Sequence, residues 1–124
     1  MDRMNKILVV DDEPDILKVV VFRLKKAGYE VTQAALGKEA LIFLKAGKPD
    51  LAILDYRLPD MSGIDIAKVM RADDALKRIP IILLTASSGE NMAVAVKETR
   101  IEGYLKKPFD PDELLEKVRE LVGK

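Results

Sequence analysis

Short apolar runs alternate along this chain with segments in which apolar residues recur every three or four positions. Three of the runs are continuous and rich in β-branched residues and leucine, a pattern that predicts strands buried on both faces. A fourth run alternates between apolar and polar residues, and a fifth is short; both also predict strands. In chain order, the expected strands cover residues 6–10, 29–34, 51–55, 81–85 and 103–106.

The segments between these runs predict five helices. The first is expected from Pro14, with Asp12 or Glu13 as its N-cap, to a stop at Gly28, because proline suits a first turn and glycine ends helices. In the fourth helix the apolar residues 93–96 surround the axis, so some of them should face outward. The other helices are expected over 37–46 with a stop at Gly47, from 63 to about 70, over about 90–100 with caps among 87–90, and from 111 onwards with Asp110 as the cap.

Strands and helices that alternate at intervals of about 25 residues predict an α/β fold. We expect a five-stranded parallel sheet with five helices on both faces, linked by right-handed crossovers. Of the common doubly wound arrangements, the flavodoxin-like strand order 2-1-3-4-5 fits five strands. A length of 124 residues suits a single domain, which we expect to cover 1–124.

Composition excludes several classes of function. The 21 basic and 21 acidic residues balance, so no net charge attracts nucleic acid or a membrane, and we expect neither as a direct partner. Because cysteine and histidine are absent, disulfides and histidine-based catalytic triads are excluded, and a metal would have only oxygen ligands. No apolar run approaches the roughly 20 residues of a membrane span, and we expect a cytoplasmic protein.

Charged and hydroxyl side chains stand where four of the expected strands end: Asp11 and Asp12, Asp55, Thr85, and Lys107. In the order 2-1-3-4-5 these residues meet at one rim of the sheet, which is where α/β folds bind ligands. Three carboxylates so close together repel one another and favour a hard cation. We expect Mg²⁺, with Mn²⁺ as an alternative, bound directly by Asp12 and Asp55 and by Asp11 either directly or through water; the backbone carbonyl of Arg57 could complete the shell.

A magnesium ion, the Lys107 ammonium and the Thr85 hydroxyl could together satisfy three phosphoryl oxygens, with Asp55 as the nucleophile that forms an acyl phosphate. Each residue also has an ordinary structural explanation: the acids could cap the first helix, and Lys107 could be a solvated surface lysine. Their common place at one rim favours the chemical explanation.

These residues resemble the receiver domain of two-component response regulators, of the chemotaxis-regulator type. The resemblance rests on Asp11-Asp12, Asp55, the loop 58–63, Thr85-Ala86 and Lys107-Pro108-Phe109, in order over residues 6–122. It implies that Asp55 accepts a phosphoryl group from the phosphohistidine of a sensor kinase or phosphotransfer protein, with Mg²⁺ required. It also implies a cis Lys107–Pro108 bond.

The resemblance further implies that Tyr104 changes rotamer on activation, together with Thr85 as a switch. The surface of the fourth helix, fifth strand and fifth helix would then change its binding to a downstream protein effector or to a second copy. Such a domain acts on its own phosphorylation and dephosphorylation and is not a turnover enzyme. The chain could be a stand-alone regulator or the N-terminal receiver of a longer one with a DNA-binding or enzymatic output domain.

Three departures and three rival functions bear on this prediction. Leu58 stands where the family commonly has Met, Arg100-Ile101 replaces a frequent Gly-Ala, and the effect of Arg57 on phosphoryl lifetime is open.

A flavin or nucleotide binder would need a phosphate-cradling loop where this chain has acids. A phosphatase of the haloacid-dehalogenase type would want a second acid at the position of Arg57. A phosphorylation-independent interaction module would not need all five of the charged and hydroxyl residues at the rim, which this chain has.

Overall fold

The structure is a computed structural model that describes residues 5–86 and 90–123. Its centre is one parallel sheet with the strand order β2-β1-β3-β4-β5, as the strand pattern predicts. Four strands have the predicted bounds, and the second begins one residue later than expected. The strands are β1 (Lys6–Val10), β2 (Glu30–Ala34), β3 (Leu51–Asp55), β4 (Ile81–Thr85) and β5 (Gly103–Lys106).

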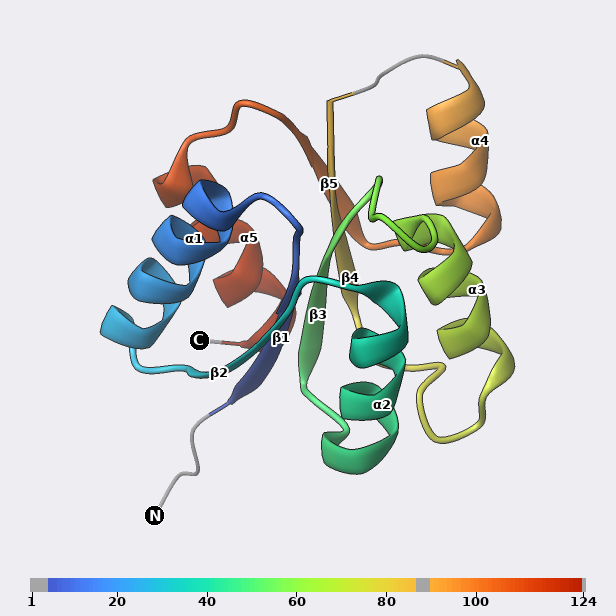
Figure 1. Ribbon diagram of the computed structural model, residues 1–124, viewed down its shortest axis with the longest axis horizontal. Coiled ribbons are helices and arrows are strands. Elements are labelled where there is room, and N and C mark those ends of the chain that lie inside the picture. Colours follow the sequence, from blue (N-terminus) through green and yellow to red (C-terminus); the bar gives the residue numbers. More distant parts are fainter. Residues whose placement is uncertain (1–4, 87–89, 124) are drawn as a thin grey trace.

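Five helices cover the two faces of the sheet. Figure 1 shows α1 and α5 together on one face, and α2, α3 and α4 on the other. This layering confirms the doubly wound α/β prediction. The helices are α1 (Pro14–Lys26), α2 (Gly37–Gly47), α3 (Gly63–Ala72), α4 (Glu90–Glu98) and α5 (Pro111–Val122).

Alternate residues of each central strand supply two separate cores. In β3, Leu51 and Ile53 face α1 and α5, whereas Ala52 and Leu54 face the other three helices. All five residues of β3 are buried, which explains why this run is apolar up to its last residue, Asp55. Burying one large apolar side chain contributes about 1.5–3 kcal/mol, so the central strands hold their ends firmly in place.

Two helix ends differ from the sequence prediction. The second helix was expected to end at residue 46, with Gly47 as the stop after it. In the structure Gly47 is still helical, and the residue after the helix is Lys48, which takes the left-handed conformation with a φ of 41°. The fourth helix was expected to run to about Arg100 but ends at Glu98. Arg100 is also left-handed, with a φ of 54°. Lysine and arginine therefore stand where glycine is usual at a helix end.

The outward-facing apolar residues predicted in α4 are present: Ala93 and Val94 are exposed, whereas Ala95 and Val96 are half-buried against the core. The predicted caps at 87–89 lie outside the described residues. The cap predicted for α5 is confirmed, since the Asp110 carboxylate accepts a hydrogen bond from the Asp112 amide at 2.9 Å. Among the helices of the described ranges, none is long and apolar enough to cross a membrane.

Candidate functional site

The predicted rim is formed by the carboxyl ends of the strands. Asp11 follows β1, Asp55 ends β3, Thr85 ends β4, and Lys107 follows β5. Parallel pairing brings these ends to the same edge, and carboxylate oxygens of Asp11, Asp12 and Asp55 lie within 4.8 Å of one another. The prediction that these three acids converge is therefore confirmed.

Lys107 holds its ammonium among the acids. Its Nζ lies 3.2 Å from Asp55 Oδ1 and 3.1 Å from Asp11 Oδ2, and the side chain is only 12% exposed. Burial lowers the pKa of Lys107, but hydrogen bonds and charges from Asp11 and Asp55 outweigh it and raise the pKa overall. Lys107 is therefore a half-buried, charged group held among the acids and not a solvated surface lysine.

The pKa of Asp55 is raised by its surroundings. Burial, and next the negative charge of Asp11, raise its pKa from the usual 3.8 to about 6, although Lys107 acts in the opposite direction. A carboxylate in this range is still mainly ionised above pH 7, so it keeps the lone pairs that a nucleophile needs. Perturbation of this kind in a cleft is typical of functional groups.

Asp11 is completely buried and has two different oxygens. Its Oδ1 accepts a hydrogen bond from the Glu13 amide at 2.9 Å and so helps to begin α1. Its Oδ2 lies 3.1 Å from Lys107 Nζ, and this ammonium is the partner found for it among the described residues. A buried oxygen of this kind, beside two further carboxylates, fits a hard divalent cation.

A cleft of about 230 Å³ opens over these groups. Asp11 and Thr85 are fully buried and do not line it. Arg57, whose backbone carbonyl is a predicted metal ligand, does line it, and its guanidinium carbon lies 6.0 Å from the centre of the Tyr56 ring. The lining residues are Asp12, Glu13, Asp55, Tyr56, Arg57, Ala86 and Lys107.

The loop after β3 is fastened so that Asp55 and Arg57 have a defined place. The Tyr56 amide donates to the Leu84 carbonyl at 2.7 Å, and the Gly63 amide donates to the Tyr56 carbonyl at 2.8 Å. A Cβ at Gly63 would lie 2.4 Å from the Asp55 carbonyl oxygen, so only glycine allows this close approach. The site therefore depends on the end of the loop as well as on the strand.

The two predicted switch residues lie on the same side of the sheet. Tyr104 pairs in register with Leu83, which packs on the core beneath α2, α3 and α4. Thr85 is two residues beyond Leu83, so alternation directs it to the same face. Thr85 is fully buried, whereas Tyr104 is 45% exposed. The backbone peptide between Lys107 and Pro108 is cis, as the resemblance implied.

Two contributors were not singled out by the sequence. Glu13 was considered only as a helix cap, yet its Oε2 lies 3.6 Å from Lys107 Nζ. Because Glu13 follows Asp11 and Asp12 directly in the sequence, a place near the site could have been expected for it. Asp60 accepts hydrogen bonds from the Gly37 and Lys38 amides, at 2.8 and 3.0 Å, and thus caps α2 from the loop that carries Arg57. Nothing in the local pattern indicates such a contact.

Comparison with known proteins agrees with this geometry. Residues 7–119 match the family model described as the response regulator receiver domain. The chain is 38% identical over 120 residues to the DNA-binding response regulator MtrA of Mycolicibacterium smegmatis, covering 96% of this chain and 51% of that protein. The chain thus spans about half the length of the curated relatives it matches.

Solved structures show the same fold. Chemotaxis protein CheY4 of Vibrio cholerae has a TM-score of 0.90 and 35% identity, covering 96% of this chain and 99% of that one. The receiver domain of the sensor histidine kinase PA1611 from Pseudomonas aeruginosa, solved with a magnesium ion coordinated in the active site cleft, has a TM-score of 0.88 and 30% identity, covering 98% and 100%. The chain belongs to the family of response regulator receiver domains.

Proposed function

We propose that the chain is a phosphorylation-activated receiver in which Asp55 accepts a phosphoryl group from the phosphohistidine of a sensor kinase or a phosphotransfer protein. The observation that carries this proposal is the Lys107 ammonium held 3.2 Å from Asp55 Oδ1. In the reaction, a carboxylate oxygen of Asp55 attacks phosphorus, the bond from phosphorus to the imidazole nitrogen breaks, and an acyl phosphate forms. Lys107 neutralises charge that builds up on the phosphoryl oxygens.

The acids Asp11, Asp12 and Asp55, with the Arg57 carbonyl, would hold Mg²⁺, or Mn²⁺ in its place. The buried Asp11 carboxylate, whose oxygens lie near those of Asp12 and Asp55, and the magnesium described for the PA1611 receiver support this choice. When bound, the ion would offset the repulsion among the carboxylates and polarise the phosphoryl group. We propose a stoichiometric phosphoacceptor and not a turnover enzyme, acting in the cytoplasm.

Incubation with acetyl phosphate or phosphoramidate and Mg²⁺ tests the phosphoacceptor. Intact-mass spectrometry should show one added phosphoryl group, lost in Asp55→Asn and in the presence of EDTA. Labelling of Asp55→Asn as strong as that of the parent would overturn the assignment, and labelling unaffected by EDTA would overturn the metal role.

The variant Lys107→Ala tests whether the Lys107 ammonium stabilises the charge on the phosphoryl oxygens. Since removing one stabilising donor of this kind typically costs about 10²-fold in rate or more, phosphorylation should slow by that factor while Mg²⁺ binding persists. The neighbouring and exposed Lys106 offers a matched control, and Lys106→Ala should be phosphorylated at the parental rate. Equal rates for both variants would contradict the role of Lys107.

Signal output is proposed to pass from Thr85 to Tyr104 and the α4–β5–α5 surface. Their common face of the sheet supports this route. The partner would be a downstream protein effector or a second copy, without direct nucleic-acid or membrane contact. Self-association or effector affinity, measured with and without the phosphoryl mimic beryllofluoride, should respond in the parent but not in Thr85→Ala or Tyr104→Ala. An equal response in all three proteins would exclude the route.

A second candidate is the N-terminal receiver of a longer regulator with a DNA-binding or enzymatic output domain. The coverage of MtrA, 51% of its length, favours it, whereas the 99% coverage of CheY4 favours a stand-alone regulator. Sequencing the native gene beyond Lys124 decides between them.

A further inference from the structure

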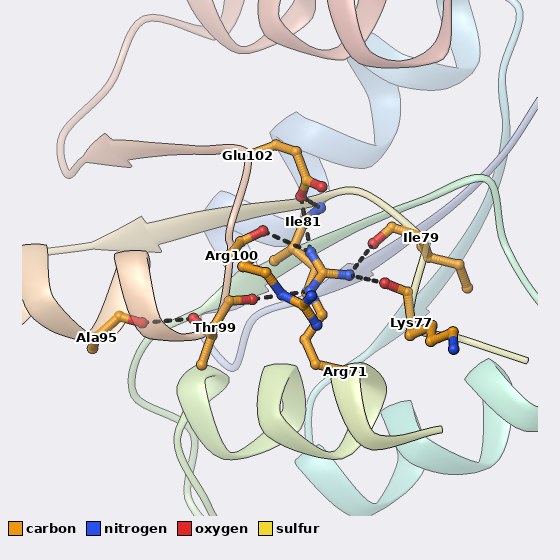
Figure 2. Close-up of polar contacts among 8 residues, drawn as sticks. All are labelled: Arg71, Lys77, Ile79, Ile81, Ala95, Thr99, Arg100 and Glu102. Atoms are coloured by element: carbon orange, nitrogen blue, oxygen red, sulfur yellow. Dashed lines mark hydrogen bonds and ion pairs between the residues drawn. The ribbon is translucent and has the colours of Figure 1, made fainter. Parts of the chain in front are cut away.

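Arg71, near the end of α3, makes an unusually complete set of hydrogen bonds. Its side chain is 9% exposed, and Figure 2 shows the guanidinium surrounded by acceptors. The five contacts come from all three of its nitrogens. Nε donates to Thr99 O at 2.9 Å, Nη1 to Lys77 O at 2.9 Å and Ile79 O at 2.8 Å, and Nη2 to Arg100 O at 2.9 Å and Glu102 Oε1 at 3.0 Å. This matches the five N–H groups that a guanidinium possesses.

The acceptors belong to two connections, one from α3 to β4 and one from α4 to β5. Thr99 and Arg100 follow the last residue of α4, while Lys77 and Ile79 lie in the connection from α3 to β4. Glu102 immediately precedes β5, and the same Oε1 accepts the Ile81 amide at 2.8 Å, which adds the start of β4. One side chain thus joins the ends of four elements at the edge of the sheet opposite the phosphorylation site.

The contact to α4 has a clear electrostatic basis. Carbonyls beyond the last turn of a helix have no partner within it, and a cation there is favoured by the helix dipole. The turn is closed by the Ile101 amide, which donates to Val96 O at 3.1 Å, and by the Arg100 amide, which donates to Lys97 O at 3.2 Å. The left-handed conformation of Arg100 is costly for a residue with a side chain, so this end needs outside support.

The C-terminal end of α4 has several partners outside the helix. The C-terminal end is bound by the guanidinium of Arg71 and by the buried residues Thr99 and Ile101. The Thr99 hydroxyl also donates to Ala95 O at 2.6 Å within the helix. The N-terminal end follows β4 and Thr85 in the chain, on the side of the phosphorylation site. A change at Thr85 would reach that end first.

We infer that Arg71 is a positioning residue for the α4–β5 face, holding the C-terminal end of α4 and the start of β5 in place. The rearrangement that follows phosphorylation is then confined to the N-terminal part of α4. This inference rests on the proposed function for its trigger, whereas the holding role of Arg71 does not depend on phosphorylation.

Amide hydrogen exchange resolved by NMR tests both parts. In the parent, beryllofluoride should change exchange at the amides of residues 94–96 and leave those of 99–101 within about twofold. In Arg71→Lys, which can donate at most three of the five bonds, the amides of 99–101 should exchange about tenfold faster even without beryllofluoride. The response to beryllofluoride should then extend to 99–101.

Arg78 provides the matched control, because it is an exposed arginine in the same connection. Arg78→Lys should exchange like the parent. Amides of β1 and β3 report global unfolding and should be unchanged in Arg71→Lys. Glu102→Gln, which keeps the acceptor but removes its charge, should give a smaller effect in the same residues and serves if Arg71→Lys does not fold.

Two results would overturn the inference: parental protection of 99–101 in Arg71→Lys, or a parental response to beryllofluoride as large at 99–101 as at 94–96. Failure of the proposed function is distinguishable, because Asp55 would then take up no phosphoryl group in the mass assay. The exchange of Arg71→Lys without beryllofluoride would still decide whether Arg71 holds α4.

Discussion

Replacing Asp55 with asparagine should stabilise the protein in the absence of metal. The pKa of Asp55 is raised to about 6 in the folded state, against 3.8 for an ordinary aspartate. Because the folded pKa is the higher one, the folded protein binds the proton more tightly. The stability that the parent gains from this tighter proton binding is fully present below pH 3.8 and is lost as the pH rises through 6.

The size of the effect follows from the same two values. A difference of about 2 units corresponds to about 3 kcal/mol between the protonated and ionised forms. Asparagine is neutral at every pH, so at pH 7.5 it avoids that cost, but it also weakens the contact with Lys107. At pH 7.5 we expect Asp55→Asn to be more stable than the parent by about 1–3 kcal/mol. At pH 5 the parental carboxyl is mostly protonated, so this advantage should be smaller by about 1.4 kcal/mol.

Urea unfolding in EDTA, followed by circular dichroism at both pH values, measures this difference. Asp74→Asn is the control, since the Asp74 side chain is 97% exposed, and it should differ from the parent by less than about 0.5 kcal/mol. Mg²⁺ at about 100 times its dissociation constant should then stabilise the parent by about 2.7 kcal/mol and Asp55→Asn much less. An asparagine variant no more stable than the parent, or an advantage independent of pH, would refute the electrostatic reasoning.

Three further changes test the parts that surround the site. Asp60→Ala should lower the urea midpoint, because the Gly37 and Lys38 amides lose their cap. The same hydrogen bonds lower the pKa of Asp60, so the difference in stability between variant and parent should shrink in acid, where Asp60 becomes protonated. Gly63→Ala should destabilise by at least about 1–3 kcal/mol, measured by the same unfolding, since its Cβ would collide with the Asp55 carbonyl; an unchanged midpoint would mean that the loop can move. Arg100→Gly should raise stability by about 0.5 kcal/mol, because relief of the left-handed conformation exceeds the entropy that glycine adds to the unfolded chain, and a loss of stability would contradict this balance.

The sequence alone determined the sheet and the convergence of the acids. Continuous apolar runs bounded by turn residues are local features, and β1, β3 and β4 have the bounds that these runs predict. Once the strand order is known, the residue that ends each strand is assigned to one rim. Asp11, Asp55 and Lys107 could therefore be brought together without coordinates.

What only the tertiary structure decided concerns contacts between residues far apart in the chain. The cap that Asp60 provides to α2 joins residues more than 20 positions apart, and the bonds from Arg71 to Thr99 and Arg100 join residues almost 30 positions apart. Local propensity carries no signal for such pairs, because their energy depends on how the helices pack on the sheet. The same reason explains why Lys48 and Arg100 adopt conformations that sequence rules assign to glycine: contacts elsewhere in the fold offset a local cost of about 1–2 kcal/mol.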